Sequence, residues 1–118
     1  FNLDNFYLIN SNWLEPLKEN SFDIVVSNPP YVAPSDPHLE ELKHEPILAL
    51  ISEQNGLEDF YLISSQAIKV LKDDGLLAFE HGKNQSNDAK KIMTIYGFKN
   101  ITLIHDYQSN PRITIGKK

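Results

Sequence analysis

Two short apolar runs near the start of the chain predict strands. Residues 6–10 ("FYLIN") and 22–27 ("FDIVVS") are rich in aromatic and β-branched residues, as strands are. The second run is almost continuously apolar, which is typical of a parallel strand covered on both faces. The segment "SNWLEPLKEN" between them has room only for a short helical turn and a loop, with Ser11 or Asn12 as a possible cap.

The second half of the chain alternates helical and strand patterns. From residue 57, apolar side chains recur mostly three and four positions apart, which predicts an amphipathic helix that ends at "KDDG" with Gly75 as its stop. The run "LLAFE", residues 76–80, predicts a buried strand. A second helix is expected over residues 87–96, where Gly97 ends it.

The chain finishes with two more strand patterns, at residues 101–106 and 112–116. The five residues "YQSNP" between them are short enough for a hairpin. Strands that are separated by helices and finish in an antiparallel pair predict an α/β sheet with parallel strands and an antiparallel edge.

Prolines concentrate in one segment, residues 29–51, which holds five of the seven in the chain. Proline neither continues a helix nor donates to a strand ladder, so the segment is predicted to be a long ordered loop with at most brief helical turns. Loops of that length inside a compact domain are usually lids or binding loops.

The candidate chemistry lies where the second strand meets this loop, at "NPPY", residues 28–31. Ligands of open α/β sheets bind beyond the carboxyl ends of the strands. Asn28 offers an amide, Pro29 and Pro30 offer backbone carbonyls with fixed φ, and Tyr31 offers a flat face for stacking. Together they suit a planar group that carries an NH₂, whose two hydrogens need two acceptors. The alternative is that these residues only terminate the strand in a turn.

Composition indicates one globular domain. The chain has 118 residues, of which 41% are hydrophobic and 23% charged. Its formal net charge of −5 argues against direct nucleic acid binding, because such surfaces are normally basic. The chain has no cysteine, hence no disulfide, and no apolar run long enough to cross a membrane, so a cytoplasmic location is expected.

Around the "NPPY" motif and beyond it, the sequence resembles a known family. The stretches "SNPPYVAPSDPHLEELKHEPILAL", "FEHG" and "DYQSNPRITIGKK" are similar to the HemK/PrmC-type peptide chain release factor glutamine N5-methyltransferases. The resemblance runs over essentially the whole chain. It implies a Rossmann-like class I fold that uses S-adenosylmethionine, without a metal, to methylate the glutamine amide of the Gly-Gly-Gln motif in class 1 release factors.

The resemblance also implies roles for individual residues. Asn28 would contact both the cofactor and the substrate amide, Pro29 and Pro30 would supply backbone acceptors and shape, and Tyr31 would pack on the substrate side chain. Trp13 falls where the family places a tryptophan against S-adenosylmethionine; an ordinary core or rim aromatic is the alternative.

Parts of the family pattern are missing from the sequence. The five glycines stand singly, without the glycine-rich loop that would cradle the cofactor. By resemblance, Phe1 falls just before strand 3 of the order 3-2-1-4-5-7-6, so residues 1–118 are expected to be the C-terminal part of a catalytic domain, strands 3 to 7, without the N-terminal helical domain. Residues 22–27 would then form an open edge. Alone, the chain is expected neither to bind the cofactor tightly nor to methylate.

Other interpretations remain open. An adenine N6-methyltransferase could use the same pocket for a flipped base; ribosomal protein L3 glutamine methylation and a noncatalytic binding module are further alternatives. His81 is expected to be structural, because methyl transfer to an amide needs no general base. A metal site is not expected in the polar cluster of the proline-rich loop, because its members crowd one segment: Asp36, His38, Glu40, Glu41, His44 and Glu45.

Overall fold

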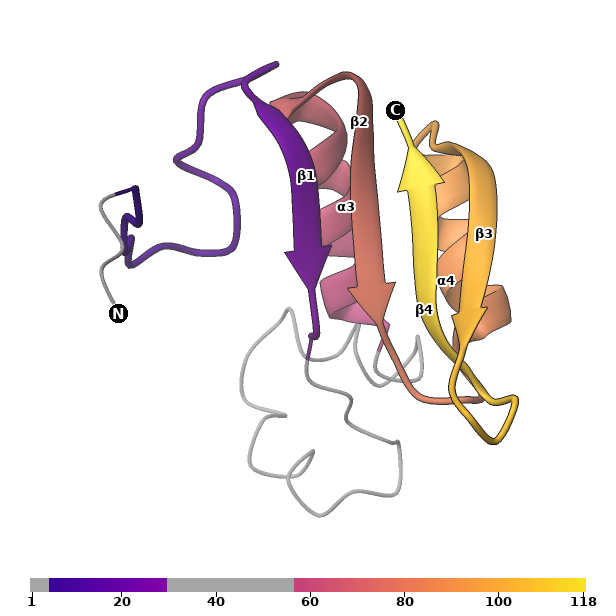
Figure 1. Cartoon of the computed structure of the whole chain (residues 1–118). Coiled ribbons are helices and arrows are strands. Elements are labelled where there is room, and N and C mark those ends of the chain that lie inside the picture. The colour runs from indigo at the N-terminus through magenta and orange to yellow at the C-terminus, as the bar shows by residue number, and fades with distance from the viewer. Residues whose placement is uncertain (1–4, 30–56) are drawn as a thin grey trace, which may run out of the picture.

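A computed structural model of the chain describes residues 5–29 and 57–118. Within them a four-stranded sheet carries two helices on one face (Figure 1). The elements follow one another as β1 (Phe22–Ser27), α3 (Glu58–Val70), β2 (Leu71–Glu80), α4 (Ser86–Ile95), β3 (Lys99–His105) and β4 (Pro111–Lys117). Neither of these helices is long and apolar enough to cross a membrane.

The sheet is mixed, in the order β1-β2-β4-β3. Strand β2 runs parallel to β1 and antiparallel to β4, and β3 is antiparallel to β4. The predicted α/β sheet with parallel strands and an antiparallel pair is therefore confirmed. Because β3 runs in the same direction as β1 and β2, all three strands end at the same edge of the sheet (Figure 1).

Helix α3 is shorter than the sequence pattern predicted. It ends at Val70, and Leu71 is already extended, with ψ of 142°. The chain then turns through Asp74, which has a positive φ of 66°. A Cβ on Gly75 would lie 2.8 Å from the carbonyl oxygen of Lys72. Gly75 therefore permits the tight turn that leads into the paired part of β2. The prediction that Gly75 stops the helix is wrong.

The predictions for the last third of the chain are confirmed. Helix α4 lies within one residue of its expected bounds at each end, and Gly97 follows it with φ of +98°, a conformation that glycine adopts at little cost. Strands β3 and β4 form the expected hairpin. Thr102 lies opposite Ile115 and Leu103 opposite Thr114, so each pair shares one face of the sheet.

The hydrophobic core lies between the sheet and the two helices. Phe60 of α3 meets Phe79 of β2 edge to face, with ring centroids 4.8 Å apart, a favourable arrangement of two aromatic rings. The fully buried apolar and polar side chains around them come from both helices and from β2 and β4: Ile63, Leu71, Leu77, Ile92, Met93, Thr114 and Ser64. The helical spacing in the sequence correctly indicated the buried faces of the two helices.

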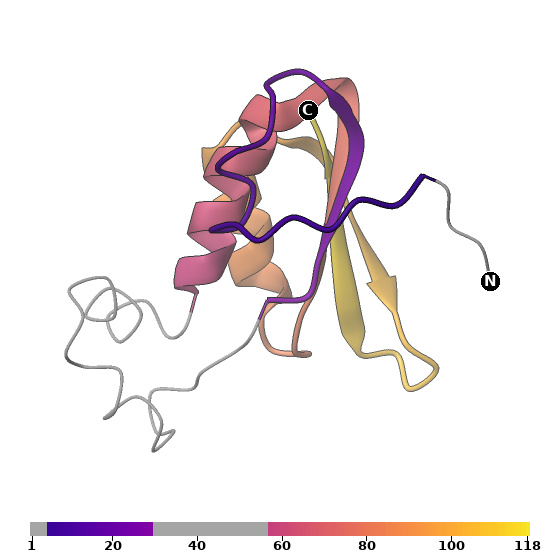
Figure 2. The same ribbon diagram turned by 90° about the vertical axis from the view of Figure 1, so that its left-hand side faces the viewer.

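Strand β1 differs from its prediction in coverage. Val25 is buried, whereas Ile24 and Val26 are 60% and 75% exposed. Both described helices lie on one side of the sheet, so the other face carries no helix within the described residues (Figure 2). Coverage of β1 on both faces is thus not found there. Among the described strands, β1 lies at an edge of the sheet, as expected.

Residues 6–10 form no strand, contrary to prediction. None of the described strands pairs with this segment, and a strand needs a partner for its backbone hydrogen bonds. Its apolar side chains are exposed, Tyr7 at 83% and Leu8 at 89%. The following turn is confirmed: the Leu17 N–H donates to the carbonyl of Leu14 at 3.0 Å.

Candidate functional site

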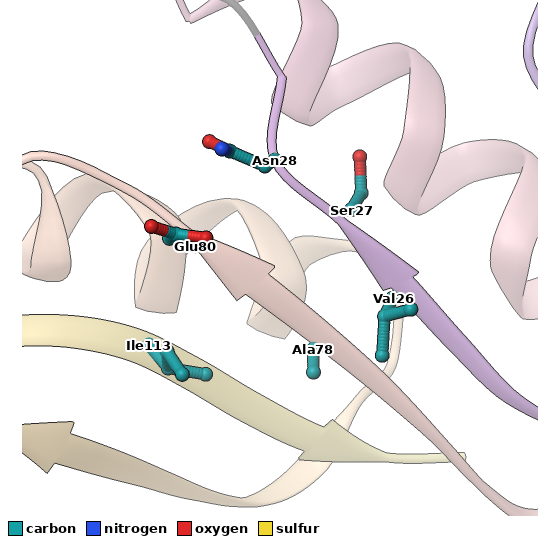
Figure 3. Close-up of a pocket in the computed structure, with 6 residues that line it drawn as sticks. All are labelled: Val26, Ser27, Asn28, Ala78, Glu80 and Ile113. Carbon is teal, nitrogen blue, oxygen red and sulfur yellow. The ribbon is translucent and has the colours of Figure 1, made fainter.

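The candidate site begins where β1 ends. The last paired residues of the parallel strands are Ser27 in β1 and Phe79 in β2. Asn28 and Glu80 come next in each strand, so the register places them side by side at the shared carboxyl edge. Figure 3 shows both side chains at this edge, at the ends of the two neighbouring strands. Both side chains are exposed, whereas Pro29 is buried.

An open pocket of about 260 Å³ lies beside these two residues. Its wall is apolar and comes from neighbouring strands, with Val26, Ala78 and Ile113 on the face that carries no described helix (Figure 3). Its polar lining comes from Ser27, Asn28 and Glu80. An apolar wall beside an amide and a carboxylate can hold a flat, uncharged group and offer acceptors to its hydrogens.

Of the four predicted residues of the "NPPY" motif, two are described. Asn28 lines the pocket, and the ring of Pro29 fixes the backbone directly after it. Pro30 and Tyr31 lie outside the described residues, as do most of the predicted proline-rich loop and its polar cluster. Within residues 5–29 and 57–118, no three His, Asp or Glu side chains gather as metal ligands.

Trp13 lies away from the pocket. It is half-buried and packs against the hydrophobic core, and its backbone has a positive φ of 56°. The Ser11 hydroxyl donates to its carbonyl at 2.7 Å. The next residue is anchored to α3, because the Leu14 N–H donates to Oε1 of Gln66 at 2.7 Å. The structure does not bring Trp13 together with Asn28 in this pocket.

His81 is structural, as the sequence suggested. Only 6% of the residue is exposed. Its Nδ1 lies 2.9 Å from the Gly82 carbonyl, and its Nε2 lies 2.7 Å from Oγ1 of Thr114. A carbonyl only accepts, so Nδ1 carries a hydrogen, and Nε2 shares a hydrogen bond with the Thr114 hydroxyl. Both nitrogens are thus occupied.

Two carboxyl groups, those of Glu58 and Asp59, lie in the first turn of α3. Burial raises the pKa of Glu58, and the neighbouring charge of Asp59 adds to this effect. Burial likewise raises the pKa of Asp59. The helix N-terminus favours negative charge at this position, which opposes the effect of burial. Neither residue lines the pocket at Asn28.

Sequence reasoning missed Glu80 as a site residue. The pattern placed it at the end of a strand, but that alone does not show which strand lies beside it. The pairing of β1 with β2 places Glu80 beside Asn28 at the same edge of the sheet. The available signal was the rule that ligands gather at the carboxyl ends of parallel strands.

Comparison with known proteins gives two results. A family model described as "Eco57I restriction-modification methylase" matches residues 2–111. Proteins named release factor glutamine methyltransferase from Aliivibrio fischeri and Vibrio cholerae are 36% and 37% identical to the chain, and that of Escherichia coli is 32% identical. These alignments cover 98% of this chain and 41% or 42% of the length of each relative.

The relatives confirm the resemblance to release factor glutamine methyltransferases that the sequence indicated. The α/β architecture and the mixed sheet also fit a class I methyltransferase fold. Since the family model matches nearly the whole chain, the chain belongs to the Eco57I restriction-modification methylase family.

Proposed function

We propose that the full-length protein containing this chain transfers a methyl group from S-adenosylmethionine to the side-chain amide of a glutamine in class 1 release factors, at their Gly-Gly-Gln motif. The observation that carries the proposal is the position of Asn28 at the carboxyl end of β1, on the polar side of a pocket whose remaining wall is apolar. The names of the relatives point to the same substrate. A cytoplasmic location is part of this proposal, because the proposed partner and reaction would require it.

The proposed reaction requires an oriented amide nitrogen more than it requires a general base. An amide nitrogen is a poor nucleophile, because its lone pair is delocalised into the carbonyl. Asn28 Oδ1 and the Pro29 carbonyl would accept its two hydrogens, aim the nitrogen and stabilise the positive charge that develops on it. Pro30 would extend the backbone wall and Tyr31 would stack on the amide plane. The nitrogen would gain the methyl carbon as the sulfur–methyl bond of S-adenosylmethionine breaks, S-adenosylhomocysteine would leave, and the methylated nitrogen would release one proton to solvent.

S-adenosylmethionine would supply an electrophilic methyl group. Asn28 fits a contact with it, because its amide is exposed at the strand end and can both donate and accept. Trp13 is the second residue proposed to face the cofactor, and its packing on the core leaves only part of the side chain exposed for this purpose. No metal takes part in the proposed reaction.

We assign the chain to the C-terminal part of the catalytic domain. In this assignment the observed order β1-β2-β4-β3 would be strands 4-5-7-6 of the family order 3-2-1-4-5-7-6. Residues 6–10 would then be strand 3, separated from β1 by two further strands. This assignment explains why the segment finds no partner among the described strands. It also explains why the chain spans only 41% or 42% of the length of its relatives.

A second candidate is methylation of the exocyclic amine of adenine in DNA. The description of the family model as a restriction-modification methylase favours it. The same acceptors would suit that amine, and an extruded base could stack on Tyr31. The net charge of −5 counts against a nucleic acid substrate.

The deciding experiment uses the full-length product of the gene that encodes the chain. It is incubated with S-adenosylmethionine carrying an isotopically labelled methyl group, and with either a class 1 release factor or duplex DNA. Mass spectrometry that finds the label on the Gly-Gly-Gln glutamine supports the proposal. Label on adenine only would support the second candidate, and label on neither would favour a noncatalytic binding module. The 118-residue chain, tested alongside, is expected to transfer no label.

A further inference from the structure

We infer that Glu80 is a positioning residue for Asn28: the two side chains share no hydrogen bond in the structure, but they lie at the ends of neighbouring paired strands, so that a change of rotamer would let the Glu80 carboxylate accept one from the Asn28 amide nitrogen and turn the amide oxygen toward the methyl acceptor. This inference rests on the proposed function, because it concerns how the same pocket presents its amide to a substrate NH₂.

The first support is the register of the sheet. Val26 pairs with Ala78 and Ser27 with Phe79 in the parallel ladder, so the next step along both strands sets Asn28 beside Glu80. Neighbouring strands lie about 4.8 Å apart, within reach of two side chains that point to the same side. Figure 3 shows both side chains at this end of the two strands, beside the pocket, and no hydrogen bond joins them in the structure.

The second support is the chemistry of the amide. Asn28 can accept a substrate hydrogen only through Oδ1, and turning the group by half a rotation would present its NH₂ to the substrate NH₂ instead. A neighbouring group that only accepts removes this ambiguity. Of the described residues that line the pocket, Glu80 alone carries a carboxylate. A hydrogen bond to a charged acceptor is also stronger than one to a neutral acceptor.

The third support is the rigidity of the backbone that carries Glu80. The N–H of the next residue, His81, donates to the Arg112 carbonyl at 2.9 Å, and the His81 ring is bonded to Thr114 on β4. The Gly82 N–H donates to Oε1 of buried Gln85 at 2.8 Å. The strand end is thus fixed on several sides, although Glu80 itself is exposed. A fixed support of this kind is what a positioning residue needs.

The test compares Glu80→Ala and Glu80→Gln in the full-length gene product, with a class 1 release factor as substrate. Asp73→Ala is the matched control, because Asp73 is also an exposed acid of β2 but lies near the strand's other end. We expect Glu80→Ala to lower kcat by roughly tenfold or more, with KM for the release factor changed less than about twofold. Glu80→Gln keeps an acceptor oxygen and should retain most of the activity.

A second readout does not depend on methylation. In the ¹⁵N-labelled 118-residue chain, the two side-chain N–H resonances of Asn28 should shift in Glu80→Ala and stay in place in Asp73→Ala. Unchanged Asn28 resonances, or an unchanged kcat in Glu80→Ala, would overturn the inference. If the unsubstituted protein methylates no release factor, the proposed function fails, and the resonances alone then decide whether Glu80 orients Asn28.

Discussion

Nε2 of His81 lies 2.7 Å from Oγ1 of Thr114, and this hydrogen bond joins the end of β2 to the middle of β4 inside the core. Both residues are buried. The bond fixes the strand end directly after Glu80, so it connects the stability of the sheet with the geometry of the candidate site.

Replacing the hydroxyl should therefore destabilise the fold. Thr114→Val keeps the shape of the side chain but leaves the His81 nitrogen buried without its partner, which costs about 1–3 kcal/mol. Urea unfolding of the chain measures this loss. Thr102→Val, at an exposed position of β3, is the control and should change the free energy of unfolding by less than about 0.5 kcal/mol. Equal effects of both substitutions would show that the hydrogen bond adds no stability.

Asp106 should make the β3–β4 hairpin sensitive to acid. Its carboxylate accepts from the Asn110 N–H at 2.9 Å, the Arg112 Nε at 3.1 Å and the Gln108 N–H at 2.8 Å. These bonds lower its pKa from 3.8 to about 2. Because the folded state favours the ionised form, the stabilisation is fully present above pH 4 and is lost as the pH falls toward 2.

The comparison is with Asp106→Asn, measured by chemical unfolding at several pH values. The variant should be less stable than the unsubstituted chain at pH 6, and the difference should shrink steadily between pH 4 and pH 2. A difference that stays constant over this range would mean that the ionised carboxylate is not the source of the stabilisation.

A methyl group at Gly116 should crowd two side chains of the core. A Cβ at this position of β4 would lie 2.6 Å from Cε of Met93 and 3.0 Å from Cβ of Phe98. Alanine normally strengthens a strand relative to glycine. Here we expect Gly116→Ala to destabilise the chain by about 1–3 kcal/mol, because the site is already filled.

A double-mutant cycle with Met93→Ala separates crowding from other effects. In that background the space vacated by Met93 should accommodate the new methyl group, so Gly116→Ala should cost less than it does in the unsubstituted chain. The crowding explanation is wrong if the cost is the same in both backgrounds.

The exposed face of β1 should promote self-association of the isolated chain. Ile24 is 60% exposed on an edge strand, and edges with apolar side chains invite pairing between molecules. Ile24→Thr should reduce association in sedimentation velocity experiments, with little loss of stability. Val25→Thr is the matched control on the buried face and should destabilise the fold by about 1–3 kcal/mol. Association that is unaffected by Ile24→Thr would point to another surface.

The sequence pattern correctly predicted the helices and strands whose ends are determined by nearby residues. The spacing before Gly97 gave helix α4, and the short loop after Asp106 gave the hairpin. The errors arose where a residue distant in the sequence determines whether a segment forms a strand or where a helix ends. Residues 6–10 have the composition of a strand, but composition does not supply a neighbour to pair with. Helical spacing continued to Leu71, yet β2 begins there because it pairs with Phe22 of β1.

The candidate site could likewise be predicted only where it depends on local sequence. Asn28 follows a recognisable strand end, so its place at the edge of the sheet could be expected. Glu80 could not be assigned to the site, because its proximity to Asn28 depends on which strands are neighbours. The packing of Trp13 on the core likewise depends on how residues 11–17 lie against α3, which the sequence does not specify.

The most direct test of the proposed function is methyl transfer by Asn28→Ala in the full-length gene product, with a class 1 release factor as substrate. Asn87→Ala, at an exposed position of α4, is the control. Removing the acceptor that orients the amide should lower kcat by about a hundredfold or more, while circular dichroism shows an unchanged fold and Asn87→Ala retains full activity. Methylation of the glutamine at an unchanged rate in Asn28→Ala would contradict the role proposed for this residue and the account of the pocket built on it.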